Sequence, residues 1–355
     1  MLRRLGPKPN ALQQILSTTD LGLSPAPIWT GEKTDVLCID LATGGLGDAI
    51  RTWRLGQTAL RLERTQKLIL RSWPNRQALW PNHTFVAPLA PLPNCPFLPA
   101  VHVLIHRSKQ SFPRQSVLQS AGKLVQIPYF DILQTKCVST SNEKTLSKCQ
   151  QNGWKGAPIV ILQLDDTKTQ HNPIHHFKNA KSPFHVLHSL IPLLKKQGVF
   201  IIGIGWGETP IKGLDIDARN CDISELVEWI QLADVLIGPD SGPQHIAALT
   251  NTKSIVLFGP SDPKLHLDNP NAIAISSSTC PTFPCGKNGA YGLQLLTGGM
   301  MHLGHGPLKI GPLPCAEQEI GICTKTISDK EILFQLTRLL STKENKSQPS
   351  PDSDG

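Results

Sequence analysis

Two segments of the sequence run from an apolar strand through a glycine-containing turn into a helix, and this pattern constrains the fold most. They are VLCIDLATGGLGDAI at residues 36–50 and VLIGPDSGPQHIAAL at residues 235–249. A buried strand followed by a helix begins a βαβ unit, and successive units build a parallel sheet. The sequence therefore predicts an α/β protein.

The first half continues with a strand expected at 67–71 and a loop at 86–100 that contains five prolines. Strands are also expected in the apolar stretches VHVLIH at 101–106 and KLVQIP at 123–128. The polar region from about 138 to 158 is the expected linker between two domains.

The second half repeats the alternation of strands and helices. Strands are expected at 159–164, 199–205, 234–238 and 254–259, with helices at 182–198, 222–233 and 328–341. Asp222 and Glu225 have the spacing of a capping box, as do Ser328 and Glu331, and Gly198 is expected to end its helix.

A chain of 355 residues is long enough for two domains, each with its own core. We expect the following organisation: an N-terminal extension (1–34), an N-terminal Rossmann-like domain (35–150), a C-terminal domain (151–327) with a cysteine-containing subdomain (280–323), a C-terminal helix (328–341) and a disordered tail (342–355).

The net charge of +8 suits an anionic partner, but the low aromatic content of 5% leaves few platforms for stacking bases and argues against nucleic acid. No run of 18 uncharged apolar residues is present, and the start MLRRLGPKPNALQQIL lacks the apolar core of a secretion signal. A cytoplasmic location is expected. The N-terminal segment is either a solvated arm or a peripheral contact with an anionic membrane.

Residues 240–245 have the composition of an anion-binding helix start. Gly242 permits close approach of a ligand to the backbone, and Pro243 suits the first helical position. Free amides and the helix dipole attract a phosphate at such a place, and Asp240 is placed to hold sugar hydroxyls. The alternatives are a capped helix start without a ligand and, for His245, a packing role.

The segment ADVLIGPDSGPQHIAALTNTKSIVLFGPSDPK resembles the donor-binding signature of glycosyltransferase family 9, the lipopolysaccharide heptosyltransferase family. VLCIDLATGGLGDAI resembles the N-terminal strand of that family and its Leu-Gly-Asp loop. The similarity extends over most of residues 36–341. It implies the GT-B architecture, in which two Rossmann-like domains face each other across a cleft, with the donor on the C-terminal domain and the acceptor on the N-terminal domain.

By this resemblance Asp48 is the general base that takes the proton from the acceptor hydroxyl, with Gly45 and Gly47 in the loop near the acceptor. An exposed aspartate has a pKa near 4 and is therefore a weak base at neutral pH. Either partial burial raises the basicity of Asp48, or Asp48 accepts the proton only as the new glycosidic bond forms. The alternative role, capping of the following helix, is compatible with the first.

The resemblance places the donor diphosphate on Ser241 and Gly242, near His245. Glu208 either holds the nucleoside ribose or is a solvated glutamate in a turn. The family has a Lys-x-Trp-Pro segment after the first strand of the second domain, and this sequence departs from it. Lys168 and Lys181 are the candidates for the missing lysine. With the helix start and the lysines neutralising the diphosphate, no cofactor is expected for catalysis.

Gly203-x-Gly205-x-Gly207 and TGGLGD raise the alternative of a nicotinamide site. That fingerprint requires Gly-x-Gly-x-x-Gly at the start of a helix and an acidic residue after the next strand. TGGLGD lacks the spacing, and GIGWGE is followed by a proline instead of an evident helix. A dehydrogenase is therefore disfavoured.

Four of the nine cysteines gather near the C-terminal end, and we call them the cysteine cluster: Cys280, Cys285, Cys315 and Cys323. Four thiolates bind zinc or iron tetrahedrally, although these gaps are wider than a Cys-x-x-Cys knuckle. Some transferases related to the family hold iron with cysteines at this place. The cluster is a structural metal site, a set of free thiols in a packed subdomain, or a pair of disulfides, with His302 and His305 as further ligand candidates.

Together these features predict an inverting glycosyltransferase. It would move a heptose-like sugar from a nucleoside-diphosphate donor, expected to be ADP-linked, to a hydroxyl of an anionic glycolipid, glycan or protein acceptor, with lipopolysaccharide synthesis as the expected setting. The alternatives are a heptosyltransferase that modifies proteins and a non-catalytic protein that binds nucleotide sugars.

Overall fold

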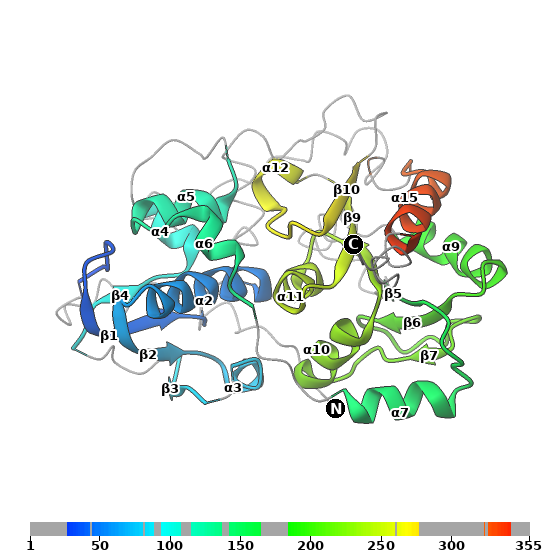
Figure 1. The fold of residues 1–355 in the computed structure, drawn as a ribbon, viewed down its shortest axis with the longest axis horizontal. Coiled ribbons are helices and arrows are strands. Elements are labelled where there is room, and N and C mark those ends of the chain that lie inside the picture. Colours follow the sequence, from blue (N-terminus) through cyan, green and yellow to red (C-terminus); the bar gives the residue numbers. More distant parts are fainter. Residues whose placement is uncertain are drawn as a thin grey trace, which may run out of the picture.

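The computed structural model describes residues 27–42, 45–80, 82–88, 94–107, 115–136, 142–164, 184–259, 261–276, 323 and 326–341. The described elements form two α/β units that lie side by side, each built on a parallel sheet (Figure 1). The predicted fold class is confirmed. The boundaries predicted for the domains stay predictions, and the N-terminal extension before residue 27 and the tail after 341 lie outside the described residues.

The first sheet has the order β3-β2-β1-β4, and all its pairs are parallel. Its strands are β1 (Thr34–Asp40), β2 (Thr65–Arg71), β3 (Thr84–Val86) and β4 (Phe97–Leu98). The helices of this unit are α2 (Leu46–Arg61), α3 (Pro74–Gln77), α4 (Val101–Arg107), α5 (Val117–Leu124) and α6 (Tyr129–Leu133). The βαβ opening predicted from the first glycine-containing segment is therefore present as β1-α2-β2.

The second sheet has the order β10-β9-β8-β5-β6-β7, again with parallel pairs only. Its strands are β5 (Ile159–Gln163), β6 (Phe200–Ile204), β7 (Ile216–Asp217), β8 (Val235–Pro239), β9 (Lys253–Phe258) and β10 (Ala272–Ser276). Counted from β5, the order is that of a Rossmann fold, in which the chain reverses direction across the sheet between β5 and β8. Ligands of such sheets bind at the carboxyl ends of the strands at this reversal.

Helices cover both faces of the second sheet, which explains the unbroken apolar runs in β5, β6 and β8. On one face lie α10 (Ile223–Leu232) and α11 (Gly242–Thr250), and on the other lie α9 (Phe184–Lys196) and α15 (Asp329–Ser341). The short α12 (Pro263–His266) follows β9. The core on the α10 and α11 face continues into the first unit, so the two units share apolar packing.

Two of the predicted helix ends are present in this unit, at Asp222 and at Gly198. Asp222 accepts a hydrogen bond from the backbone amide of Glu225 at 2.9 Å and caps α10. Gly198 has a φ of +71° after α9, the left-handed conformation that ends a helix.

One expected strand is a helix, a second lies mostly between two helices, and the expected linker contains another helix. VHVLIH forms α4, because Val101 and Leu104, three residues apart, are buried on one face. KLVQIP begins in the last turn of α5, whose start is capped by the hydroxyl of Ser116. Within 138–158 the chain forms α7 (Glu143–Gln151), which packs on α10.

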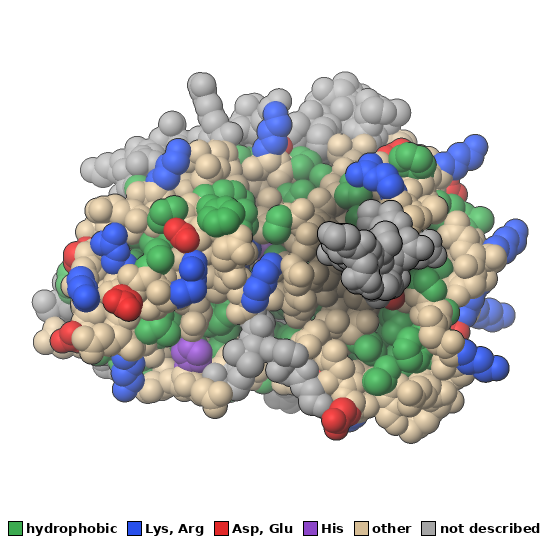
Figure 2. Space-filling view, in the orientation of Figure 1, with side chains coloured by type: hydrophobic (Ala, Val, Ile, Leu, Met, Phe, Trp, Pro, Cys, Tyr) green, Lys and Arg blue, Asp and Glu red, His purple; other side chains and the backbone are tan. Residues whose placement is uncertain are grey.

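Lys148 connects α7 to α10 of the second unit. Lys148 forms an ion pair with Glu225, and its Nζ lies 5.6 Å from the centroid of the Trp229 ring on α10. On the face shown in Figure 2, lysine and arginine side chains are spread over both units. Across the described residues, no helix combines the length and the apolar character that a bilayer crossing requires.

Candidate functional site

The carboxyl ends of β5 and β8 form the first half of the candidate site. Gln163 ends β5, and Asp240 and Ser241 follow β8 directly. The Ser241 hydroxyl donates a hydrogen bond to Oε1 of Gln163 at 2.7 Å and is within 3.2 Å of the carbonyl oxygen of Pro239. These bonds fix the start of α11 at the strand reversal, where the fold predicts a ligand.

The first turn of α11 is suited to an anion. Ser241 is the N-cap residue in an extended conformation, and its side chain makes no cap hydrogen bond because the hydroxyl is directed to Gln163. The first amides of a helix have no acceptor within the helix and carry the positive end of its dipole. Ser241, Gly242 and Pro243 are only partly buried, so this corner is accessible from outside the protein.

The carboxylate of Asp240 is oriented by two neighbours beside that corner. Oδ2 accepts a hydrogen bond from the Ser261 hydroxyl at 2.8 Å, and Oδ1 lies 3.4 Å from Nε2 of Gln244. Asp240 is half-buried, whereas Gln244 is buried. A carboxylate held in this way has a fixed direction in which it can accept hydrogen bonds from hydroxyl groups.

The start of α2 forms the second half of the site. Gly45 is the N-cap residue, and its amide donates a hydrogen bond to Oδ2 of Asp48 at 3.3 Å. The side chain of Asp48 is buried, and its Oδ1 lies 4.0 Å from Nη1 of Arg51. Asp48 thus takes part in capping α2, which is the second of the two roles predicted for it from the sequence.

The starts of α2 and α11 meet where two glycines leave room. A Cβ atom on Gly47 would lie 2.5 Å from Cδ2 of His245, and one on Gly242 would lie 2.8 Å from Cδ2 of Leu46. Such distances are far inside van der Waals contact, so a side chain at either position would push the helices apart. The contact, visible between α2 and α11 in Figure 1, brings the Asp48 turn of one unit to the Ser241 turn of the other.

His245 is buried in this contact as a neutral ring. Burial and the positive charge of Arg51 hold the pKa of His245 well below its ordinary value, and the opposing effect of Asp240 is smaller. Nε2 of the ring lies 3.1 Å from Nε2 of Gln244. The imidazole therefore packs between the units without adding a positive charge near neutral pH.

Asp268 joins the two units through its buried carboxylate. It follows α12 in the second unit and is 1% exposed. Oδ2 accepts a hydrogen bond from Nε of Arg51 at 2.7 Å, and Oδ1 accepts one from the Tyr129 hydroxyl at 3.1 Å and another from the Ser116 hydroxyl. Nη2 of Arg51 also donates to the carbonyl oxygen of His266 at 2.8 Å.

The electrostatics of this interface keep Arg51 charged. Its burial lowers its pKa, but the carboxylates of Asp268 and Asp48 outweigh burial, and the net direction is upward. Burial lowers the pKa of Arg76, whose Nη1 donates to the carbonyl oxygen of Leu41 at 3.0 Å.

The other predicted site residues are further away or outside the described residues. Glu208 is exposed in the loop after β6, one strand beyond β5. Asn220 braces that loop, because its Nδ2 donates to the carbonyl oxygen of Gly207 at 2.7 Å. The half-exposed Trp206 lies in the same loop. Lys168 and Lys181 lie outside the described residues.

The metal site predicted at the cysteine cluster is only partly within the described chain. Cys323 is buried, whereas Cys280, Cys285, Cys315, His302 and His305 lie outside the described residues. Among the described residues, no group of three His, Cys, Asp or Glu side chains is arranged to hold a metal ion. The cluster stays a prediction.

Sequence reasoning missed Gln163, Arg51 and Asp268. Arg51 is three residues after Asp48 on one helix face, and this spacing was readable in the sequence. Nothing in the sequence pairs Arg51 with Asp268, which is 217 residues away.

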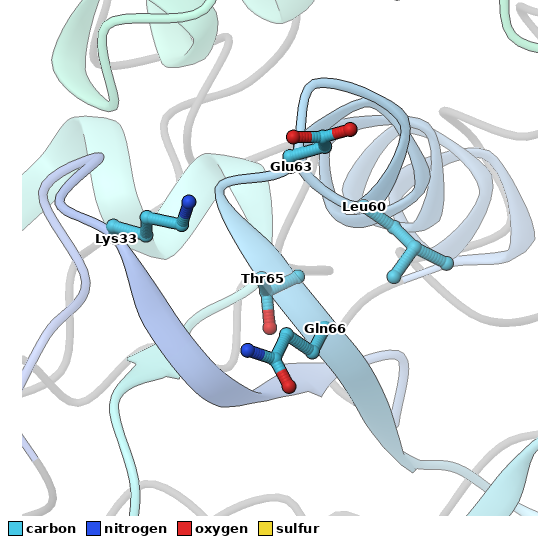
Figure 3. Close-up of a pocket in the computed structure, with 5 residues that line it drawn as sticks. All are labelled: Lys33, Leu60, Glu63, Thr65 and Gln66. Carbon is cyan, nitrogen blue, oxygen red and sulfur yellow. The ribbon is translucent and has the colours of Figure 1, made fainter.

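A pocket of about 330 Å³ is formed by Lys33, Leu60, Glu63, Thr65 and Gln66 (Figure 3). It lies at the amino ends of β1 and β2 and the carboxyl end of α2. The candidate site is at the opposite end of α2. The pocket is therefore separate from the contact between the two units.

The chain resembles known proteins in part of its sequence and in its fold. Residues 218–290 match glycosyltransferase family 9 (heptosyltransferase). Compared by sequence with curated proteins, the chain has no match.

Three solved structures are similar in fold. The iron-containing dodecameric glycosyltransferase TibC from enterotoxigenic Escherichia coli has a TM-score of 0.54 and 16% identity, over 88% of this chain and 77% of TibC. A family 9 glycosyltransferase from Veillonella parvula has a TM-score of 0.54 and 12% identity, over 88% of this chain and 99% of that protein. TibC in complex with ADP-D-β-D-heptose has a TM-score of 0.52 and 15% identity, over 89% of this chain and 78% of TibC.

Two Rossmann-like units that meet at a strand reversal with an anion-suited helix start have the GT-B architecture of these similar structures. The match at residues 218–290 adds the family, and the chain is a glycosyltransferase that resembles family 9, the heptosyltransferases.

Proposed function

We propose that this glycosyltransferase moves a heptose-like sugar from an ADP-linked donor to an acceptor hydroxyl, with inversion at the anomeric carbon. The contact of Gly47 with His245 and of Gly242 with Leu46 carries the proposal, because it brings a carboxylate of one unit to the anion-suited helix start of the other. The choice of donor is supported by the fold similarity to TibC, which has been solved with ADP-D-β-D-heptose.

In this proposal the second unit holds the donor. The amides at Ser241 and Gly242 and the dipole of α11 bind the diphosphate. Asp240, oriented by Ser261, accepts hydrogen bonds from the sugar hydroxyls. Glu208 holds the ribose, and Lys181 or Lys168 adds a second positive charge. His245 supports this corner by packing under it, and its own contact with the donor stays a prediction.

In the proposed reaction the base and the leaving group lie on opposite sides of the anomeric carbon. Asp48 takes the proton of the acceptor hydroxyl while the hydroxyl oxygen forms a bond to the anomeric carbon. The bond from that carbon to the diphosphate oxygen breaks, and its electron pair leaves with the diphosphate. Charge then develops next to the start of α11, where the amides stabilise it. Attack from the face opposite the leaving group inverts the anomeric configuration.

Asp48→Asn tests the proposal. We expect turnover to fall by about 10²–10⁴-fold, the usual contribution of a general base. The assay is release of ADP from ADP-D-β-D-heptose, with water as the acceptor, and calorimetry with ADP measures binding. Binding should keep the wild-type affinity, because Asp48 does not belong to the diphosphate corner. Asp35→Asn, at an exposed position of β1, is the matched control.

Turnover of Asp48→Asn close to that of the wild type would refute the assignment of the base. A wild-type protein that binds ADP but releases none from the sugar nucleotide, whatever glycan, glycolipid or peptide is added, would favour the non-catalytic alternative. The acceptor, whether a glycan or a protein side chain, is proposed only as an anionic molecule, from the net charge of +8. The cytoplasmic location and contact with a membrane stay predictions.

A further inference from the structure

Arg51 stands between two buried carboxylates. Its Nε and Nη2 face the second unit, at 2.7 Å from Asp268 and 2.8 Å from the carbonyl oxygen of His266. Its Nη1 faces Asp48 at 4.0 Å, which is beyond hydrogen-bond distance. The side chains of Arg51 and Asp268 are 4% and 0% exposed, so water does little to screen the charges.

The position of Asp268 is itself determined by the first unit. The Tyr129 hydroxyl and the Ser116 hydroxyl both donate to Oδ1, which leaves Oδ2 for Arg51. Nη1 of Arg54 also donates to the backbone carbonyl oxygen of Asp268 at 3.1 Å. A carboxylate with this many donors cannot follow Arg51 if the arginine moves, so it acts as a fixed anchor.

We propose that Asp268 is a positioning residue that holds the Arg51 guanidinium away from a direct hydrogen bond with Asp48. This inference rests on the proposed role of Asp48 as the base. A guanidinium that donated directly to Asp48 would compete with the acceptor hydroxyl for the lone pairs of the carboxylate oxygens. Held at 4.0 Å, Arg51 compensates the charge of Asp48 without that bond.

Removing the charge of Asp268 should redirect Arg51. In Asp268→Asn, Asp48 is the carboxylate that attracts the Arg51 guanidinium most strongly, and it lies on the same helix face. We expect an Arg51–Asp48 hydrogen bond of about 3 Å in a crystal structure of this variant. We also expect kcat for ADP release from ADP-D-β-D-heptose to fall at least about tenfold, with little change in KM. An unchanged separation of 4.0 Å would overturn the inference without any reference to activity.

The double variant Asp268→Asn, Arg51→Gln distinguishes positioning from a purely structural role. It removes the guanidinium that would capture Asp48, so turnover should rise above that of Asp268→Asn alone. A structural role predicts the reverse, because a second contact between the units is lost. The double variant removes the charges of Asp268 and Arg51 together, so neither of these two is left buried without the other if the single variant is unstable.

Tyr129→Phe is the matched control, because it removes one hydrogen bond to Asp268 and leaves the contact of Asp268 with Arg51. Its turnover should stay near that of the wild type, and a loss equal to that of Asp268→Asn would refute the proposal. An active Asp48→Asn would instead refute the proposed base. An inactive Asp48→Asn together with no gain in the double variant would leave the base standing and overturn this inference alone.

Discussion

Replacing Gly47 with alanine tests the contact between the two units quantitatively. The new Cβ would lie 2.5 Å from Cδ2 and 2.7 Å from Nε2 of His245, a residue that is 4% exposed. Overpacking of this kind costs about 1–3 kcal/mol. Alanine inside a helix also stabilises it by about 0.5–1 kcal/mol relative to glycine. The net loss in free energy of unfolding should therefore be about 0–2.5 kcal/mol.

A double-mutant cycle with His245→Ala isolates the steric part. In that background the Cβ has room, so Gly47→Ala should stabilise the protein instead of destabilising it. The coupling energy, measured by urea unfolding, should be about 1–3 kcal/mol. Gly45→Ala is the control, because its Cβ would meet nothing closer than Oδ2 of Asp48 at 4.0 Å. A coupling below about 0.5 kcal/mol for Gly47, or one of equal size for Gly45, would refute the reasoning.

Three further predictions address a cap, a buried histidine and the cysteines. Asp222→Ala should lower the free energy of unfolding by about 1 kcal/mol, and Asp222→Asn by much less, because only alanine loses the bond to the Glu225 amide. The pKa of His245 is lower in the folded than in the unfolded protein, so the unfolded state binds more protons below about pH 6.5. Stability should therefore be full above that pH and fall on acidification by up to about 1.4 kcal/mol per pH unit; a pH series of urea titrations in which His245→Gln has the same slope would contradict this. Elemental analysis of purified protein should find zinc or iron if the cysteine cluster is a metal site, and less than about a tenth of an equivalent would exclude it.

The four inner strands of the second sheet could be predicted because both of its faces are covered, whereas the edge strands β7 and β10 were not predicted. Strands buried on both faces are continuous apolar runs, and the glycines and caps between them mark the helix boundaries. Asp222 and Gly198 both lie where this reasoning placed them. Here local preference and tertiary packing favour the same structure.

The first unit was harder, because its apolar runs are short and ambiguous. In residues 101–106 the β-branched residues alternate as in a strand, yet burial of Val101 and Leu104 on one face makes the segment a helix. In a segment of six residues, neither length nor periodicity distinguishes a strand from a helix. Ser116 caps the start of α5 and indicates this helix, but it lies before residues 123–128, which were expected to form a strand.

The candidate site could be predicted where each residue acts through its own neighbours in the chain. Ser241 and Gly242 follow directly from a strand that leads into a helix. Gln163 and Asp268 could not be found in this way, since their partners come from distant parts of the chain. Such contacts depend on how the two units dock, and docking has no local sequence pattern.

The buried carboxylate of Asp268 requires the first unit to supply hydrogen-bond donors that fit it. A chimera that kept the second unit and took the first unit from a relative would bury this charge against a foreign surface. Burial without partners costs several kcal/mol, so the new half must bring Arg51, Ser116 and Tyr129 with it. Exchange of specificity by recombination is therefore restricted to relatives that carry the same set of donors.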